Sequence, residues 1–290
     1  YAAIGYGKEG YGKEADHKVV YVDHGLNVFL HGLRNAFLNQ PHVTYITHGT
    51  DHLEAYGIDL PEREKPRRPL LGNPATVLMG AIRHLRCAPP ERRVLMANYT
   101  PHYANHCGRF HDCDRYMRDL LSAARTLVER GACVTYRPHH GENPAYIFYM
   151  IEAMGLTGRV SVDDTGTFEE ALPRHDVFVA NTTSCIYQAL YAGWPTVFFD
   201  PGMDMDYLIG MPAATDIFRP VAQSPEQLVE MVEAAFDPTS EAGQFPARFS
   251  GALAQRFVGP AAERSDQAIA DFIRQELGLL ATEEHPRRVA

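Results

Sequence analysis

Short apolar runs alternate with longer amphipathic segments along most of the chain. The runs are rich in Val, Ile, Phe and Tyr, and several are apolar on both faces, which is typical of buried parallel strands. They span residues 18–24, 42–48, 93–98, 132–139, 160–164, 177–181 and 195–200. Segments with the period of a helix span residues 26–38, 74–85, 114–130, 145–155, 168–174, 184–192, 225–236 and 261–277. This alternation predicts doubly wound α/β sheets with right-handed crossovers.

A break near residues 87–93 divides the chain into two parts. The sequence CAPPERR places prolines and charges between a helical pattern and a new strand, as a linker does. We therefore expect an N-terminal α/β domain at residues 1–88, a Rossmann-type nucleotide-binding domain at residues 89–260, and a C-terminal helix and tail at residues 261–290. The N-terminal domain has few clear strands, so we expect it to be short or truncated.

Composition and charge narrow the classes of function. Hydrophobic residues make up 45% of the chain and charged residues 22%, which is typical of a globular protein. The net charge of −9 argues against a nucleic-acid partner, because binding to the phosphate backbone needs a basic face. The sequence shows no transmembrane or signal-peptide pattern. The odd count of five cysteines favours reduced thiols and a cytoplasmic protein.

The ends of the predicted strands carry the candidate chemistry. In an open parallel sheet, ligands bind at the carboxyl ends of the strands. Polar or titratable residues follow nearly every predicted strand here, among them His24, Thr100, Arg137, His139 and Asp164. A purely structural sheet would not need histidines at these positions. Asp164 would lie beside a bound nucleoside or belong to an ordinary Asx turn.

A turn with three hydroxyl residues is the most informative segment. Thr182, Thr183 and Ser184 stand between the strand at 177–181 and the next helix. Hydroxyls and free N–H groups at a helix N-terminus bind phosphate or diphosphate groups. One of these residues would also serve as an N-cap, but three in a row exceed what capping requires. The turn therefore predicts a phosphate site.

This segment carries a resemblance to a known family. The strand, the polar turn, the helix and the sequence AGWPTVFFDP that follows resemble the donor-binding half of GT-B glycosyltransferases. The pattern is similar in particular to the CDP-glycerol glycerophosphotransferase family, which builds teichoic-acid and capsule-type polymers. That family's turn reads Asp-Tyr-Ser-Ser, and its hydroxyl pair corresponds to Thr183 and Ser184. Its acidic residue four positions further on is Gln188 here, which departs from the pattern.

Further short motifs extend the resemblance over most of residues 18–236. Arg137 and His139 stand in a segment similar to the family's Arg-Pro-His-Pro element. His24 stands in a His-Gly element, and residues 72–74 form a Gly-Asn-Pro element. The resemblance implies two doubly wound Rossmann-type domains with a cleft between them, and residues 98–114 would be a loop that faces this cleft.

The resemblance also implies a reaction. The protein would move a glycosyl or polyol-phosphate group from a nucleotide-activated donor to a hydroxyl of a sugar, polyol or polymer acceptor. His24 would act as general base, and its alternative role is to shape its turn. Arg137 and His139 would neutralise the phosphate charge that develops as the nucleotide leaves, and Arg137 would otherwise hold its loop through a salt bridge.

The donor would be bound without a cofactor. Its contacts would come from Thr182, Thr183, Ser184, Gln188, Asp164 and Thr100. The helix N-terminus, Arg137 and His139 would replace a divalent ion, so no obligatory metal is expected. A polymer acceptor would imply a role in cell-envelope or capsule synthesis and peripheral association with the membrane through that acceptor.

Other interpretations remain open. Residues 22–27, VDHGLN, are similar to the Val-Glu-Ala-Gly-Leu-Arg element of the non-hydrolysing UDP-N-acetylglucosamine 2-epimerases, which share the GT-B fold. A non-catalytic nucleotide-binding module is a third possibility. A zinc site is conceivable in the cluster from His102 to Cys113, but the cluster lacks the CxxC pair typical of zinc sites.

Overall fold

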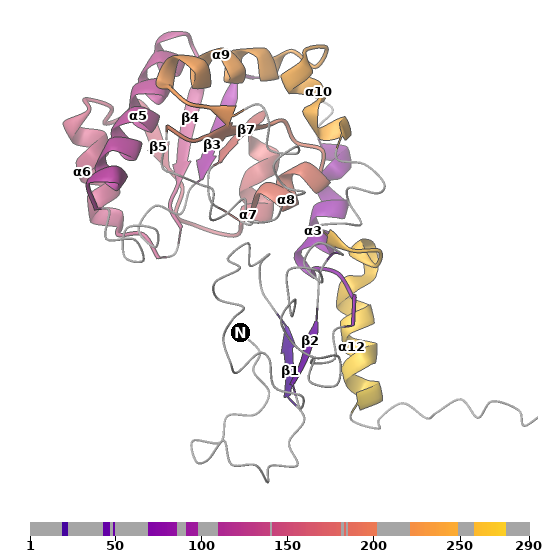
Figure 1. Ribbon diagram of the computed structural model, residues 1–290. Helices are drawn as coiled ribbons and strands as arrows, with labels where there is room; N and C mark the ends of the chain where they lie inside the picture. The colour runs from indigo at the N-terminus through magenta and orange to yellow at the C-terminus, as the bar shows by residue number, and fades with distance from the viewer. Residues whose placement is uncertain are drawn as a thin grey trace, which may run out of the picture.

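The architecture comes from a computed structural model that describes residues 19–22, 43–46, 49, 69–85, 91–97, 110–139, 141–180, 183, 185–201, 221–248 and 258–276. Within these residues, a six-stranded parallel sheet covered by helices forms the larger unit (Figure 1). A two-stranded parallel sheet with a long helix beside it forms the smaller unit. The predicted α/β class is confirmed.

The larger sheet has the strand order β5-β4-β3-β6-β7-β8, and every neighbouring pair is parallel. Its strands are β3 (Arg93–Ala97), β4 (Cys133–Arg137), β5 (Val160–Val162), β6 (Val177–Ala180), β7 (Thr196–Phe199) and β8 (Val221–Ala222). The apolar runs predicted the first five. β8 has only two residues, which is too short for a hydrophobic pattern to reveal.

Helices cover both faces of this sheet, as a doubly wound fold requires (Figure 1). Side chains alternate along a strand, so Val94 and Met96 enter one core while Leu95 and Ala97 enter the other. The first core is closed by α5 (Phe110–Glu129), α6 (Pro144–Ala153) and α9 (Pro225–Phe236). The second is closed by α3 (Ala75–Ile82), α7 (Phe168–Ala171) and α8 (Cys185–Tyr191).

Local sequence signals explain where several of these helices begin. The Ser224 hydroxyl accepts a hydrogen bond from the Gln227 N–H, and Pro225 takes the first helical position of α9. Thr167 and Glu170 form a reciprocal capping box at α7. These caps agree with the predicted starts at residues 225 and 168.

The helices α5 and α10 differ from the sequence prediction. α5 begins at Phe110, so the last residues of the predicted cleft-facing loop at 98–114 belong to this helix. α10 (Glu241–Arg248) was not predicted, because Gly243 and Pro246 both disfavour a helix. Its contacts with α9 and β7 hold it in place despite these residues.

The smaller unit combines strands from the early part of the sequence with a helix from its late part. β1 (Val19–Val22) pairs in parallel with β2 (Val43–Ile46), and α12 (Ser265–Glu276) packs its Ile269 and Phe272 against Ile46. A parallel pair needs a crossover connection. The helix predicted for this crossover, at residues 26–38, lies outside the described residues.

The Gly-Asn-Pro element lies where the two units meet. Gly72 has a φ of +85°, and a Cβ atom there would lie 3.0 Å from the Ser265 Cβ atom, so glycine is required. The Asn73 carbonyl accepts hydrogen bonds from the hydroxyls of Thr76 and Ser265. The α3 helix that follows packs against α8 of the larger unit. The domain boundaries near residues 88 and 260 remain predictions.

Candidate functional site

The strand order places a topological switch point between β3 and β6. From β3 the chain winds outward through β4 and β5, and it then returns to the other side of β3 to form β6, β7 and β8. Ligands of open α/β sheets bind where the connections diverge in this way, beyond the carboxyl ends of the two central strands. Ala97 and Ala180 end these strands side by side. The segments that follow them contain the predicted site residues Thr100 and Thr182 to Ser184.

Thr183 is the member of the hydroxyl turn that the structure describes. Its Oγ1 accepts a hydrogen bond from the Cys185 N–H at 3.3 Å, and its carbonyl accepts one from the Ile186 N–H at 3.2 Å. Thr183 therefore performs the capping role that the sequence left open for it. Because a hydroxyl accepts through a lone pair, its proton remains able to donate to an anion.

Arg137, at the end of β4, reaches the loop that follows β5. Its guanidinium donates to the carbonyls of Thr165 at 3.0 Å and Gly166 at 2.6 Å. Its Nη1 atom lies 3.6 Å from an oxygen of the Asp163 carboxylate. Arg137 thus holds this loop, which is the alternative role that the sequence suggested for it.

Asp163 is the centre of a small charged group. Its Oδ2 atom lies 2.6 Å from Nη2 of Arg174, and its Oδ1 atom accepts hydrogen bonds from the N–H and the hydroxyl of Thr165. Burial alone would raise the pKa of Asp163, but the Thr165 hydrogen bonds and the charges of Arg174 and Arg137 together lower it below its usual value. Asp163 thus lies between two guanidinium groups, those of Arg137 and Arg174.

The loop around Asp163 has the form of an Asx turn, because Asp163 Oδ1 accepts from the N–H two residues ahead. The strand predicted at 160–164 therefore ends earlier, at Val162. Asp164, the predicted nucleoside contact, is the exposed central residue of this turn, which is the alternative place that the sequence left open for it.

A carboxylate that the sequence reading missed lies near the start of α8. Gln188 Nε2 donates to Glu169 Oε1 at 3.3 Å, which joins the first turns of α7 and α8. Burial raises the pKa of the Cys185 thiol to about 11, and the charges of Glu169 and Arg137 act on it in opposite directions. The thiol is therefore protonated at neutral pH and is not a ready nucleophile. These interactions place four side chains close together: Gln188, Glu169, Cys185 and Arg137.

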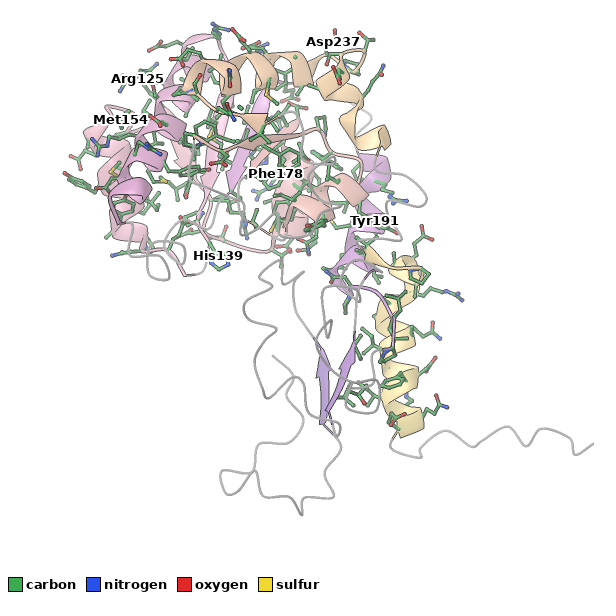
Figure 2. All side chains as sticks on the ribbon, in the orientation of Figure 1. Arg125, His139, Met154, Phe178, Tyr191 and Asp237 are labelled. Atoms are coloured by element: carbon green, nitrogen blue, oxygen red, sulfur yellow. The ribbon has the colours of Figure 1, made fainter. Side chains whose placement is uncertain are left out.

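His139 lies in the loop between β4 and α6, at the lower edge of the larger unit in Figure 2. Its Nδ1 accepts a hydrogen bond from the Gly141 N–H at 3.1 Å. The backbone N–H of His139 donates to Glu142 Oε2 at 2.8 Å. Glu142 is a second residue that sequence reasoning missed, although a carboxylate three residues after a strand-end histidine is a signal for such a turn.

Several predicted residues lie outside the part of the chain that the structure describes. They are His24, Thr100, Thr182, Ser184 and most of the His102–Cys113 cluster. Among the described residues, no group of three or more His, Cys, Asp or Glu side chains is arranged to hold a metal ion. None of the helices described here is long and apolar enough to cross a membrane.

No protein-family model matches this chain, and no curated protein is detectably similar to it in sequence. Solved structures are similar in fold. The wall teichoic acid polymerase TagF matches with a TM-score of 0.54 at 15% identity, over 81% of this chain and 58% of the polymerase. The UDP-GlcNAc 2-epimerase from Neisseria meningitidis bound to UDP-GlcNAc matches with a TM-score of 0.51 at 11% identity, over 85% of this chain and 68% of the epimerase.

These likenesses agree with the GT-B-type fold that the sequence motifs suggested. The chain spans less than two thirds of the polymerase structures that it matches. At such low identity the likeness concerns the fold alone.

Proposed function

We propose that this protein is a transferase that uses a nucleotide-activated donor and modifies a hydroxyl acceptor. One observation carries the proposal: the switch point between β3 and β6 lies between two polar segments, and the Arg137 guanidinium stands at the end of the adjacent strand β4. An α/β sheet of this strand order binds nucleotides at that place. A guanidinium at this place suits a phosphorylated ligand, because its fork of N–H donors matches phosphate oxygens.

The donor's phosphates lie over the turn from Thr182 to Ser184 in this proposal. The Thr183 hydroxyl, already held by the Cys185 N–H, would donate its proton to a phosphate oxygen. Gln188 lies one turn further along α8, Thr100 follows β3 and Asp164 follows β5, and these residues would contact the rest of the nucleotide.

Arg137 and His139 act on the leaving group. The Arg137 guanidinium is a cation with a fork of N–H donors, so it would stabilise the phosphate charge that develops as the nucleotide leaves. His139 contributes a hydrogen bond. These groups take the place of a divalent ion, and we expect activity to survive EDTA.

His24 is the proposed general base. It would take the proton of the acceptor hydroxyl while the acceptor oxygen bonds to the transferred group and the bond from that group to the nucleotide phosphate breaks. The acceptor is a sugar, polyol or polymer of the cell envelope or capsule. The protein would work in the cytoplasm and meet the membrane only through such an acceptor.

A 2-epimerase of the non-hydrolysing type is the second candidate. The observation in its favour is that the epimerase structure matches over a larger share of both chains than the polymerase structures do. It would use the same nucleotide site but would need no acceptor.

Incubation of the full chain with a panel of CDP- and UDP-activated donors tests both candidates. The transferase predicts nucleotide release that requires an acceptor such as glycerol phosphate or a polyol oligomer, and that persists with EDTA. An epimerised sugar nucleotide without any acceptor would establish the second candidate. Tight nucleotide binding without turnover of any donor would leave a non-catalytic binding module. Absence of nucleotide binding would contradict all three.

A further inference from the structure

Glu142 is a buried carboxylate at the base of the loop that carries His139. Its exposed fraction is 6%, and it stands one residue before Asn143, the N-cap of α6. The positive end of the helix dipole favours a negative charge at such a position. A carboxylate is costly to bury, so its hydrogen-bond partners indicate what it holds in place.

Those partners come from the strand and from His139 itself. The buried Tyr136 hydroxyl lies 3.0 and 3.1 Å from the two oxygens of Glu142 and donates to this carboxylate. The His139 N–H donates to Glu142 Oε2 at 2.8 Å, and the Glu142 N–H donates to the His139 carbonyl at 2.8 Å. Both backbone groups of His139 are therefore bound to this one residue.

The same turn determines the state of the imidazole. The Gly141 N–H donates to His139 Nδ1 at 3.1 Å, and only an unprotonated ring nitrogen can accept. The imidazole in this arrangement is neutral and carries its proton on Nε2. Because Nδ1 is turned toward the Gly141 amide, the Nε2–H group lies on the other side of the ring and is directed away from that amide.

We propose that Glu142 is a positioning residue that locks His139 as a neutral Nε2–H hydrogen-bond donor for a phosphate oxygen of the bound nucleotide. The inference deepens the proposed function and rests on it for the identity of the ligand. It changes the role of His139 from a cation to a directed neutral donor, and it leaves Arg137 as the cation of the pair.

The tautomer can be measured without any ligand. The full chain contains 14 histidines, so the His139 signal in a ¹⁵N-histidine-labelled sample is assigned by its loss in His139→Gln. At about pH 8, where an ordinary histidine is neutral, long-range ¹H–¹⁵N spectra should show His139 protonated on Nε2 alone. A His139 ring protonated on Nδ1 in the unmodified chain overturns the proposal.

Two variants separate positioning from general stability. Glu142→Ala removes the acceptor of the His139 backbone N–H and should convert His139 to a mixture of tautomers. Tyr136→Phe removes one donor to the carboxylate but keeps the carboxylate itself, and should leave the tautomer unchanged. An unchanged His139 spectrum in a folded Glu142→Ala variant contradicts the positioning role.

Binding of CDP and UDP by calorimetry tests the ligand. Glu142→Ala should raise the nucleotide Kd by roughly tenfold, the value of one hydrogen bond, and His139→Ala by a similar factor. Tyr136→Phe should change it much less. Normal nucleotide affinity in a folded Glu142→Ala variant would refute the phosphate contact while the proposed function stands. Failure of the unmodified chain to bind any nucleotide would refute the proposed function and, with it, the assigned ligand, but not the measured tautomer.

Discussion

Two neighbouring loops at the carboxyl edge of the larger sheet are each organised by one carboxylate, in opposite ways. Asp163 organises the loop after β5 with two arginines, and its side chain keeps 13% of its exposure. Glu142 organises the loop after β4 with the Tyr136 hydroxyl and a backbone N–H, and it is more deeply buried. Ion pairing near solvent makes the first loop sensitive to pH and salt. Hydrogen bonds from neutral donors in the interior make the second loop depend on the geometry of its packing.

The largest effect on stability is expected from removing the buried carboxylate. Glu142→Ala leaves the Tyr136 hydroxyl and the His139 N–H without this acceptor, at a cost of about 2–4 kcal/mol in the free energy of unfolding. Asp163→Ala should cost less, because water can reach the groups that it releases. Urea denaturation of both variants measures the contrast. An equal loss in the two would mean that burial does not distinguish the loops.

The next effect concerns ligand binding. Arg137→Ala removes a charge from the proposed phosphate site and should raise the nucleotide Kd by about tenfold to a hundredfold. Arg137→Lys keeps the charge but loses the fork that spans the Thr165 and Gly166 carbonyls. Its nucleotide Kd should therefore lie between that of the unmodified protein and that of Arg137→Ala. Calorimetric titration gives the Kd values. Unchanged binding together with a lower melting temperature would make Arg137 a loop-holding residue only.

A smaller effect should depend on pH. The pKa of Asp163 is lowered in the folded protein, so its charged form stabilises the fold above the pKa of the unfolded chain, and this stability is lost as the pH falls through the folded value. Asp163→Asn should therefore cost about 1 kcal/mol at pH 7, and this difference should begin to shrink below about pH 4 and vanish only once the pH is below the lowered pKa of Asp163. Melting temperatures across this range provide the measurement. A difference that stays constant as the pH falls below about 4 would attribute the effect to packing.

The smallest effect is expected at the exposed arginine. Arg174 keeps 57% of its side-chain exposure, so Arg174→Ala should cost no more than about 0.5–1 kcal/mol despite its short contact with Asp163. The cost should shrink further in 1 M salt, because salt screens exposed charge pairs. The Glu142→Ala cost should not respond to salt in this way. A salt-independent loss at Arg174 would show that the pair is less accessible to solvent than its exposure indicates.

Much of the fold was predictable because its signals are local. Buried parallel strands are apolar on both faces, so runs such as 177–181 and 195–200 identified β6 and β7 without any knowledge of their neighbours. The caps at Thr167 and Ser224 are local signals of the same kind, because each side chain accepts from an N–H group only three residues further on. α10 was missed because its stability comes from packing on α9, which overrides the unfavourable local preferences of Gly243 and Pro246.

The residue types at the strand ends, and therefore the candidates Arg137, His139 and Thr183, were determined by the sequence alone, because the chemistry of a side chain and its place after an apolar run are both local. What these side chains contact was decided by the tertiary structure. The carbonyls held by Arg137 and the arginine that meets Asp163 lie 11 to 29 residues away along the chain. Glu142 gained its importance only when the fold buried it beneath His139, because burial turns an ordinary surface carboxylate into a group whose every hydrogen bond must be provided by the protein.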